Sequence, residues 1–163
     1  MRILLVVFLL GIQTLSIFAE KIMVSAQDFD QVSGPSGEDF RKEGSIGLGV
    51  KSLTSERVDF VRVLDLPSGQ MVKKIKAFVR VNSNSIMTVQ LAYVNPKNDT
   101  ASLIATSTFT GLTSNEIEGV VLGIQDAGHV INTKKYEYVL ILTFSQGGDD
   151  ENLMFFGAKI NVQ

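Results

Sequence analysis

The chain has 163 residues, a formal net charge of −2 and no cysteine. The lack of cysteine excludes disulfides, thiol catalysis and thiolate metal sites. The mildly acidic balance differs from the basic surface that general nucleic-acid binding needs, so we expect no nucleic-acid partner.

Residues 1–19 have the pattern of a secretory signal peptide. Arg2 supplies the positive start, an almost unbroken apolar run extends from Ile3 to Gly11, and small and polar residues follow as far as Ala19. The run is too short for a membrane-spanning helix, which needs about 20 strongly apolar residues. We therefore expect cleavage near Ala19 and a secreted, periplasmic or cell-surface chain. An exported chain without cysteine favours a bacterial source.

The remaining residues predict a single domain, because they are enough for one sizeable core. No helical periodicity persists, and short β-rich runs alternate with clusters of Gly, Ser, Asn, Asp and Pro. Residues 20–57 are expected to hold an N-terminal strand at 22–25, a polar arm or loop at 27–45 and a strand at 46–53, all within the same domain. The body of the β-sandwich is expected at 58–163.

The stretch DLPSGQMVKKIKAFVRVNSNSIMTVQLAYV at 65–94 predicts a turn and then an antiparallel hairpin. Pro67 fixes φ and Gly69 can take a positive φ, which makes LPSG a turn. Apolar residues then alternate with polar ones on both sides of the polar loop NSNS at 82–85. The core-facing residues of the two strands are expected to be Ile75, Ala77, Val79 and Val81, then Met87, Val89, Leu91 and Tyr93.

The other strands complete an all-β prediction. We expect them at 58–64, 101–108, 117–124, 136–144 and 152–162. The last two are partly apolar on both faces, which is typical of covered strands. Either a loop or the arm covers them, or Val139, Ile141 and Phe155 form a homo-oligomer interface. The whole pattern predicts one antiparallel β-sandwich, jelly-roll-like, of about eight strands.

Several short motifs resemble those of a secreted bacterial β-sandwich domain family of uncharacterised function. They are a leucine-proline-x-glycine turn, an asparagine-serine loop, a tyrosine-x-tyrosine strand and a closing glycine-x-x-isoleucine strand. Here they are Leu66, Pro67 and Gly69; Asn82 and Ser83; Tyr136 and Tyr138; and Gly157 and Ile160. The resemblance covers about residues 58 to 163. It implies the fold and no particular activity, because these are turn and core residues.

A basic strand face is the first candidate binding surface. Its residues are Lys74, Lys76, Phe78 and Arg80, with Asn82 in the adjoining loop. It is either a solvated outer face that discourages edge-to-edge pairing or a patch for an anionic glycan or an envelope protein. The sequence leaves both interpretations open.

The acidic loop SQGGDDENL is a candidate calcium site through Asp149, Asp150 and Glu151, because oxygen-rich loops at the ends of sandwiches can hold this ion. No other cofactor is expected. His129 is the only histidine, and it is either a loop residue or the base of an enzyme. Asn98 begins a glycosylation sequon, which matters only in a eukaryotic host.

Sugar-binding sandwiches use exposed aromatic platforms. All three tyrosines of this chain, Tyr93, Tyr136 and Tyr138, fall on core-facing phases of their strands. The leading hypothesis is nevertheless a non-catalytic secreted or envelope module that binds a glycan or protein or has a structural role. The alternatives are a secreted hydrolase or lyase that uses the acidic loop residues with His129, and a homo-oligomeric surface component.

Overall fold

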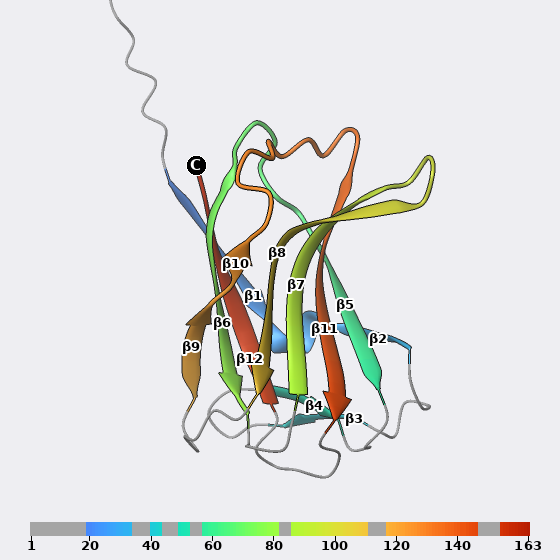
Figure 1. The fold of residues 1–163 in the computed structure, drawn as a ribbon, viewed down its shortest axis with the longest axis vertical. Coiled ribbons are helices and arrows are strands. Elements are labelled where there is room, and N and C mark those ends of the chain that lie inside the picture. The colour runs from blue at the N-terminus through green and yellow to red at the C-terminus, as the bar shows by residue number, and fades with distance from the viewer. Residues whose placement is uncertain are drawn as a thin grey trace, which may run out of the picture.

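The described residues form two antiparallel β-sheets packed face to face (Figure 1). The computed structural model describes residues 19–33, 40–43, 49–52, 57–81, 86–110, 117–146 and 154–163. Within these ranges no helix is long and apolar enough to cross a membrane. The predicted class, an all-β sandwich, is confirmed.

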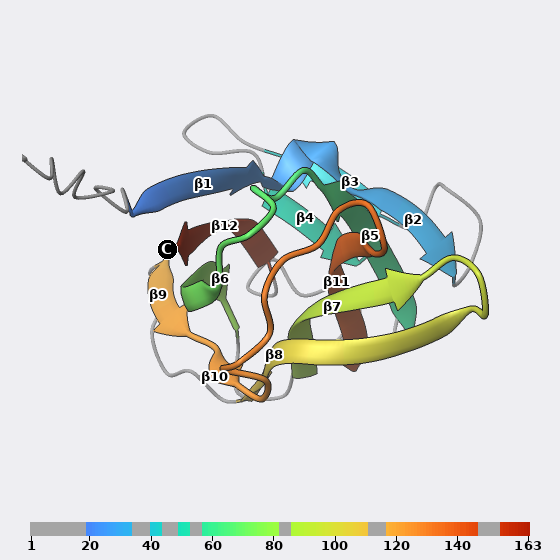
Figure 2. The same ribbon diagram turned by 90° about the horizontal axis from the view of Figure 1, so that it is seen from above.

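The first sheet, called sheet A, contains β3 (Phe40–Glu43), β4 (Gly49–Ser52), β12 (Met154–Val162), β6 (Val72–Arg80) and β9 (Glu118–Val121), in that order, with β1 (Glu20–Ser25) also paired to β12. The second sheet, called sheet B, has the order β10 (Gly123–Ile124), β8 (Thr100–Thr110), β7 (Ile86–Asn95), β11 (Glu137–Gln146), β5 (Val58–Leu64) and β2 (Asp30–Ser33). Figure 2 shows the two sheets from the end where the long loops lie.

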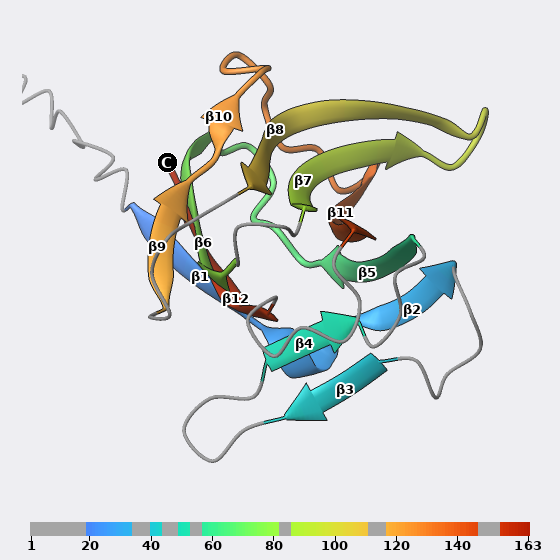
Figure 3. The same ribbon diagram turned by 60° about the horizontal axis from the view of Figure 1, so that its bottom comes forward.

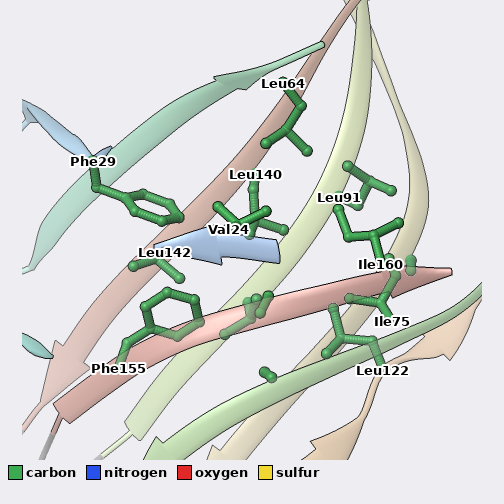
Figure 4. Close-up of a cluster of buried hydrophobic side chains, with 14 of the residues drawn as sticks. Val24, Phe29, Leu64, Ile75, Leu91, Leu122, Leu140, Leu142, Phe155 and Ile160 are labelled. Carbon is green, nitrogen blue, oxygen red and sulfur yellow. The ribbon is translucent and has the colours of Figure 1, made fainter. Parts of the chain in front are cut away.

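The core fills the space between the sheets, because each central strand turns alternate apolar residues inward. Ile75 and Ile160 come from sheet A, and Leu91 and Leu140 from sheet B, and all four are fully buried (Figure 4). Burying one such side chain stabilises the fold by about 1.5–3 kcal/mol. The inward phases predicted for residues 75–81 and 87–91 are confirmed.

The predicted hairpin of residues 72–81 and 86–94 is wrong. The two strands lie in different sheets: β6 pairs with β12 and β9, whereas β7 pairs with β8 and β11. The chain therefore passes from sheet A to sheet B between Val81 and Ile86; residues 82–85, including the predicted loop, lie outside the described residues. A strand with one buried face shows the same alternation whether its neighbour pairs beside it or packs opposite it, so local pattern could not separate the two.

A long antiparallel hairpin joins β7 to β8 instead. The Asn95 side-chain oxygen accepts a hydrogen bond from the Lys97 amide at 3.1 Å, and Asp99 has a φ of +52°. Asn and Asp favour such turns because they tolerate left-handed φ and bond their own backbone. The sequon residue Asn98 is exposed at this tip.

The N-terminal segment links the two sheets, which corrects the expectation of a polar arm at 27–45. β1 joins sheet A, the short 3₁₀ helix η1 (Ala26–Asp28) follows, and β2 joins sheet B, while β3 pairs with β4. Phe29 is buried and packs edge-on against Phe155, with ring centroids 5.3 Å apart. Short, polar edge strands give little periodicity, which is why the pattern missed β2 and β3.

The predicted strand at 117–124 is divided between the sheets. β9 pairs with β6 in sheet A, β10 pairs with β8 in sheet B, and Leu122 is buried between them. This division and the short edge strands give twelve strands in the described residues rather than about eight. Figure 3 shows β9 and β10 running on from one another along one side of the sandwich.

A bulge in β12 overturns the phase expected for Phe155. Phe155 pairs with Val79 and Gly157 pairs with Phe78, so one extra residue lies between them. Gly157 has a φ of +142°, which glycine adopts easily. Phe155 is therefore fully buried in the core, whereas Phe156 is half-buried.

Candidate functional site

Residues 125–136 cross above the sheets at one end of the sandwich (Figure 1, top). Three tyrosines and the histidine gather at this end. This aromatic cluster consists of Tyr93, His129, Tyr136 and Tyr138. Tyr93 on β7 is directly opposite Tyr138 on β11. The rings of Tyr93 and His129 are stacked with centroids 4.0 Å apart, and Tyr136 lies 4.8 Å from Tyr93.

The buried Tyr138 hydroxyl organises this cluster. It accepts a hydrogen bond from the Asn132 amide at 2.8 Å and lies 2.9 Å from Nε2 of His129. On the other side of the ring, Nδ1 of His129 lies 3.8 Å from a carboxylate oxygen of Asp126. Burial lowers the pKa of His129, although Asp126 opposes the effect, and burial raises the pKa of Tyr138. His129 thus holds the loop to the sheet as a neutral ring.

The LPSG turn supports the same loop. The amide of Gly69, whose φ is +88°, donates to the Ile131 carbonyl at 2.8 Å, and the Ile131 amide donates to the Gln70 carbonyl at 2.8 Å. Met71 adds an isolated β-bridge to Val130. The turn predicted from sequence is confirmed, and its place in the fold is to fix the loop that carries the aromatic cluster.

An open groove of about 340 Å³ lies beside the cluster. It is lined by Arg62, Val63, Leu64, Asp65, Thr133, Tyr136, Glu137 and Tyr138. A smaller hollow of about 100 Å³ shares residues 62–65 and continues to β1 and Asp28. The groove lies at this edge because β2 pairs with β5 only at Asp59–Val61, so residues 62–65 extend beyond the edge strand.

The groove combines one aromatic wall with both signs of charge. Tyr136 is half-buried, while Arg62, Asp65 and Glu137 are exposed. The Lys135 ammonium lies 4.9 Å from the centre of the Tyr136 ring, and its hydrogen bond with Tyr136 raises the pKa of Lys135. These side chains can both donate hydrogen bonds to a polar ligand and accept them from it.

The basic face predicted on β6 lies on the outer side of sheet A and not at the groove. Lys74 is exposed, and Lys76, Phe78 and Arg80 are half-buried. The Lys76 ammonium lies 5.6 Å from the centre of the Phe78 ring, and the Arg80 guanidinium lies 5.5 Å from that of Phe156.

Asn82 and the candidate calcium ligands Asp149, Asp150 and Glu151 lie outside the described residues. Of the predicted interface residues, Phe155 is fully buried, so its side chain offers no contact to another subunit. Val139 is 8% exposed and Ile141 is half-buried, and oligomerisation through them stays a prediction.

Sequence reasoning missed the groove residues because phase alone assigned the tyrosines to the core. Tyr138 is buried as predicted, but Tyr93 and Tyr136 are only half-buried. Tyr136 directly precedes β11, at the edge of the sandwich, and that position was the signal available in the sequence.

No family model matches the chain, and no curated protein matches it. Among solved structures it is similar to the CBM22-1–GH10 modules of a Clostridium thermocellum endo-1,4-β-D-xylanase 10B complexed with xylohexaose, with 14% identity, a TM-score of 0.49, and coverage of 90% of this chain and 28% of that one. A family 35 carbohydrate-binding module from Clostridium thermocellum gives 15% identity, a TM-score of 0.46, and coverage of 87% and 98%. A structure of infectious bursal disease virus strain Gt gives 11% identity and a TM-score of 0.38, and the match covers 88% of this chain and 33% of that one. At these values the likeness says nothing about what this chain binds.

Proposed function

We propose that this chain is an exported, non-catalytic β-sandwich module that binds a glycan in the groove beside Tyr136. The observation that supports this proposal is the open groove of about 340 Å³, whose lining includes the half-buried Tyr136 together with Arg62, Asp65, Thr133 and Glu137. The apolar face of a sugar ring packs on an aromatic side chain, and its hydroxyls exchange hydrogen bonds with charged and polar groups.

A binding role rather than an enzymatic one is supported by the state of His129. Its Nε2 is bonded to the Tyr138 hydroxyl, and its ring face is stacked on Tyr93. A general base must be within reach of the proton that it abstracts, and this histidine is directed at the protein instead. The groove carboxylates Asp65 and Glu137 then serve as hydrogen-bond acceptors.

Export is the second part of the proposal, and it is supported by the leader pattern of residues 1–19. Expression of the full chain in a bacterial host, followed by N-terminal sequencing of the exported protein, tests it. A new N-terminus near Glu20 supports export, whereas a cell-retained chain that begins at Met1 would contradict it.

The glycan proposal is tested by screening the exported protein on an array of neutral and acidic oligosaccharides, with and without Ca²⁺, and measuring the hits by calorimetry. Tyr136→Ala is expected to weaken binding by about threefold to tenfold, the value of one aromatic stacking contact. Phe78→Ala removes another half-buried ring, on sheet A, and should leave binding to a neutral glycan unchanged. Equal losses in both variants, or release of shortened sugars by the wild-type protein, would contradict the proposal.

A further inference from the structure

The outer face of sheet A brings together cations from three strands that are far apart in the sequence. β1 and β6 pair with opposite edges of β12, so three strands lie side by side (Figure 2). One row of the register contains Lys21, Asn161 and Lys74, and the next contains Met23, Lys159 and Lys76. The basic strand face expected from sequence is thus one part of a wider cationic surface.

This surface, defined here by Lys21, Lys74, Lys76 and Lys159, includes two cations at opposed register positions. Lys159 is directly opposite Lys76 in the register of β12 and β6. Like charges at opposed positions destabilise a sheet. No carboxylate occupies these two rows among the described residues, although the chain as a whole has a net charge of −2. An anion that lies across two opposed cations offsets the repulsion between them.

The four lysines differ in exposure, and one of them packs along the sheet. Lys76 and Lys159 are half-buried, while Lys21 and Lys74 are exposed. Gly119 on β9 leaves room for the Lys76 side chain, because a Cβ there would lie only 2.1 Å from Cε of Lys76. Lys76 also lies over the Phe78 ring. The Lys76 side chain therefore lies along the sheet and does not project from it.

We propose that this cationic surface binds an acidic polysaccharide, with the carboxylates of successive sugars lying over the lysine rows. Lysines at alternate positions of one strand are about 7 Å apart, so a linear polyanion can contact several of them at once. The exposed apolar residues Met23 and Val121 lie at opposite edges of the row, with Lys159 and Lys76 between them. Insertion into a lipid bilayer needs a continuous apolar face, so the arrangement fits a polysaccharide better than a membrane.

The test uses the exported full chain and three probes: polygalacturonate, neutral dextran, and vesicles of phosphatidylglycerol and phosphatidylcholine. We expect binding to polygalacturonate that weakens as salt is added, because exposed charges are screened. The variant Lys76→Gln/Lys159→Gln should weaken it by about tenfold. Its Tm should stay level or rise, because the repulsion is removed. The matched control Lys97→Gln/Lys134→Gln removes two exposed cations elsewhere and should bind as wild type.

No polygalacturonate binding at low salt, binding to the anionic vesicles alone, or an equal loss in the control variant would each overturn the proposal. A fall in the Tm of Lys76→Gln/Lys159→Gln would show that the pair is stabilising, which contradicts the argument from repulsion. Failure of this surface leaves the Tyr136 groove unaffected, because a neutral glycan tests that site.

Discussion

His129 shows how one side chain can have opposite interpretations in sequence and in structure. As the only histidine in the chain, it was the sole candidate base for an enzyme. Its ring instead stacks on Tyr93 and bonds the Tyr138 hydroxyl, and so it holds the loop beside the groove. The hydrogen bond joins His129 to Tyr138, nine positions away, and no sequence motif predicts it.

This contact predicts a pH dependence. Because burial lowers the folded-state pKa of His129 below the ordinary value of about 6.5, the unfolded chain binds the proton more readily. The part of the free energy of unfolding that comes from keeping His129 neutral is therefore fully present above about pH 6.5. It is lost as the pH falls through the folded-state pKa. Denaturant unfolding between pH 7.5 and 5.5, with NMR titration of the histidine ring, measures it.

His129→Phe keeps an aromatic ring beside Tyr93 and removes the titration. The variant should therefore lose most of the slope of stability against pH over this interval. A wild-type histidine that titrates above about pH 6.5 would contradict the assignment.

The register of β12 depends on a single backbone position, Gly157. The bulge before Gly157 turns Phe155 into the core, against Phe29 from the N-terminal segment. A sequence alternation read without the bulge assigns Phe155 to the outside, which is the error that made it an interface candidate. Glycine in a strand is a signal of such a bulge, but it does not say on which side of it the phase changes.

Gly157→Ala should destabilise the protein by more than about 1 kcal/mol, since both strain and a clash follow. The φ of +142° is unfavourable for alanine, and the new Cβ would lie 2.6 Å from the Val24 carbonyl oxygen. Gly69→Ala is the matched control, because Gly69 has a φ of +88° but no atom within 4 Å of the Cβ position. Chemical denaturation compares the two, and an equal loss would show that strain alone acts at Gly157.

At the level of the full fold, the two proposed surfaces belong to different sheets and carry different chemistry. The groove beside Tyr136 is formed where β5 and β11 of sheet B reach the loops, and it holds both signs of charge. The lysine rows lie on β1, β12 and β6 of sheet A. The two proposals therefore assign a neutral sugar and an acidic polymer to separate surfaces of one chain.

The separation predicts that the two surfaces act independently. Tyr136→Ala should weaken binding to a neutral glycan and leave the binding of polygalacturonate unchanged, while Lys76→Gln/Lys159→Gln should do the reverse. Distant sites without shared partners contribute additively to free energy. Calorimetry of both variants with both ligands measures this, and a loss of both activities in either variant would indicate one shared site.

The sequence by itself determined the all-β class, the LPSG turn and the strand at 58–64, because strand alternation and turn residues act over a few neighbouring positions. It did not determine which strands pair: β6 and β7 have matched phases and yet lie in different sheets. It also did not predict the groove. Tyr136 has a core-facing phase, but it lies just before β11 and is only half-buried. Pairing and cover depend on contacts between distant segments, and only the tertiary structure decides those.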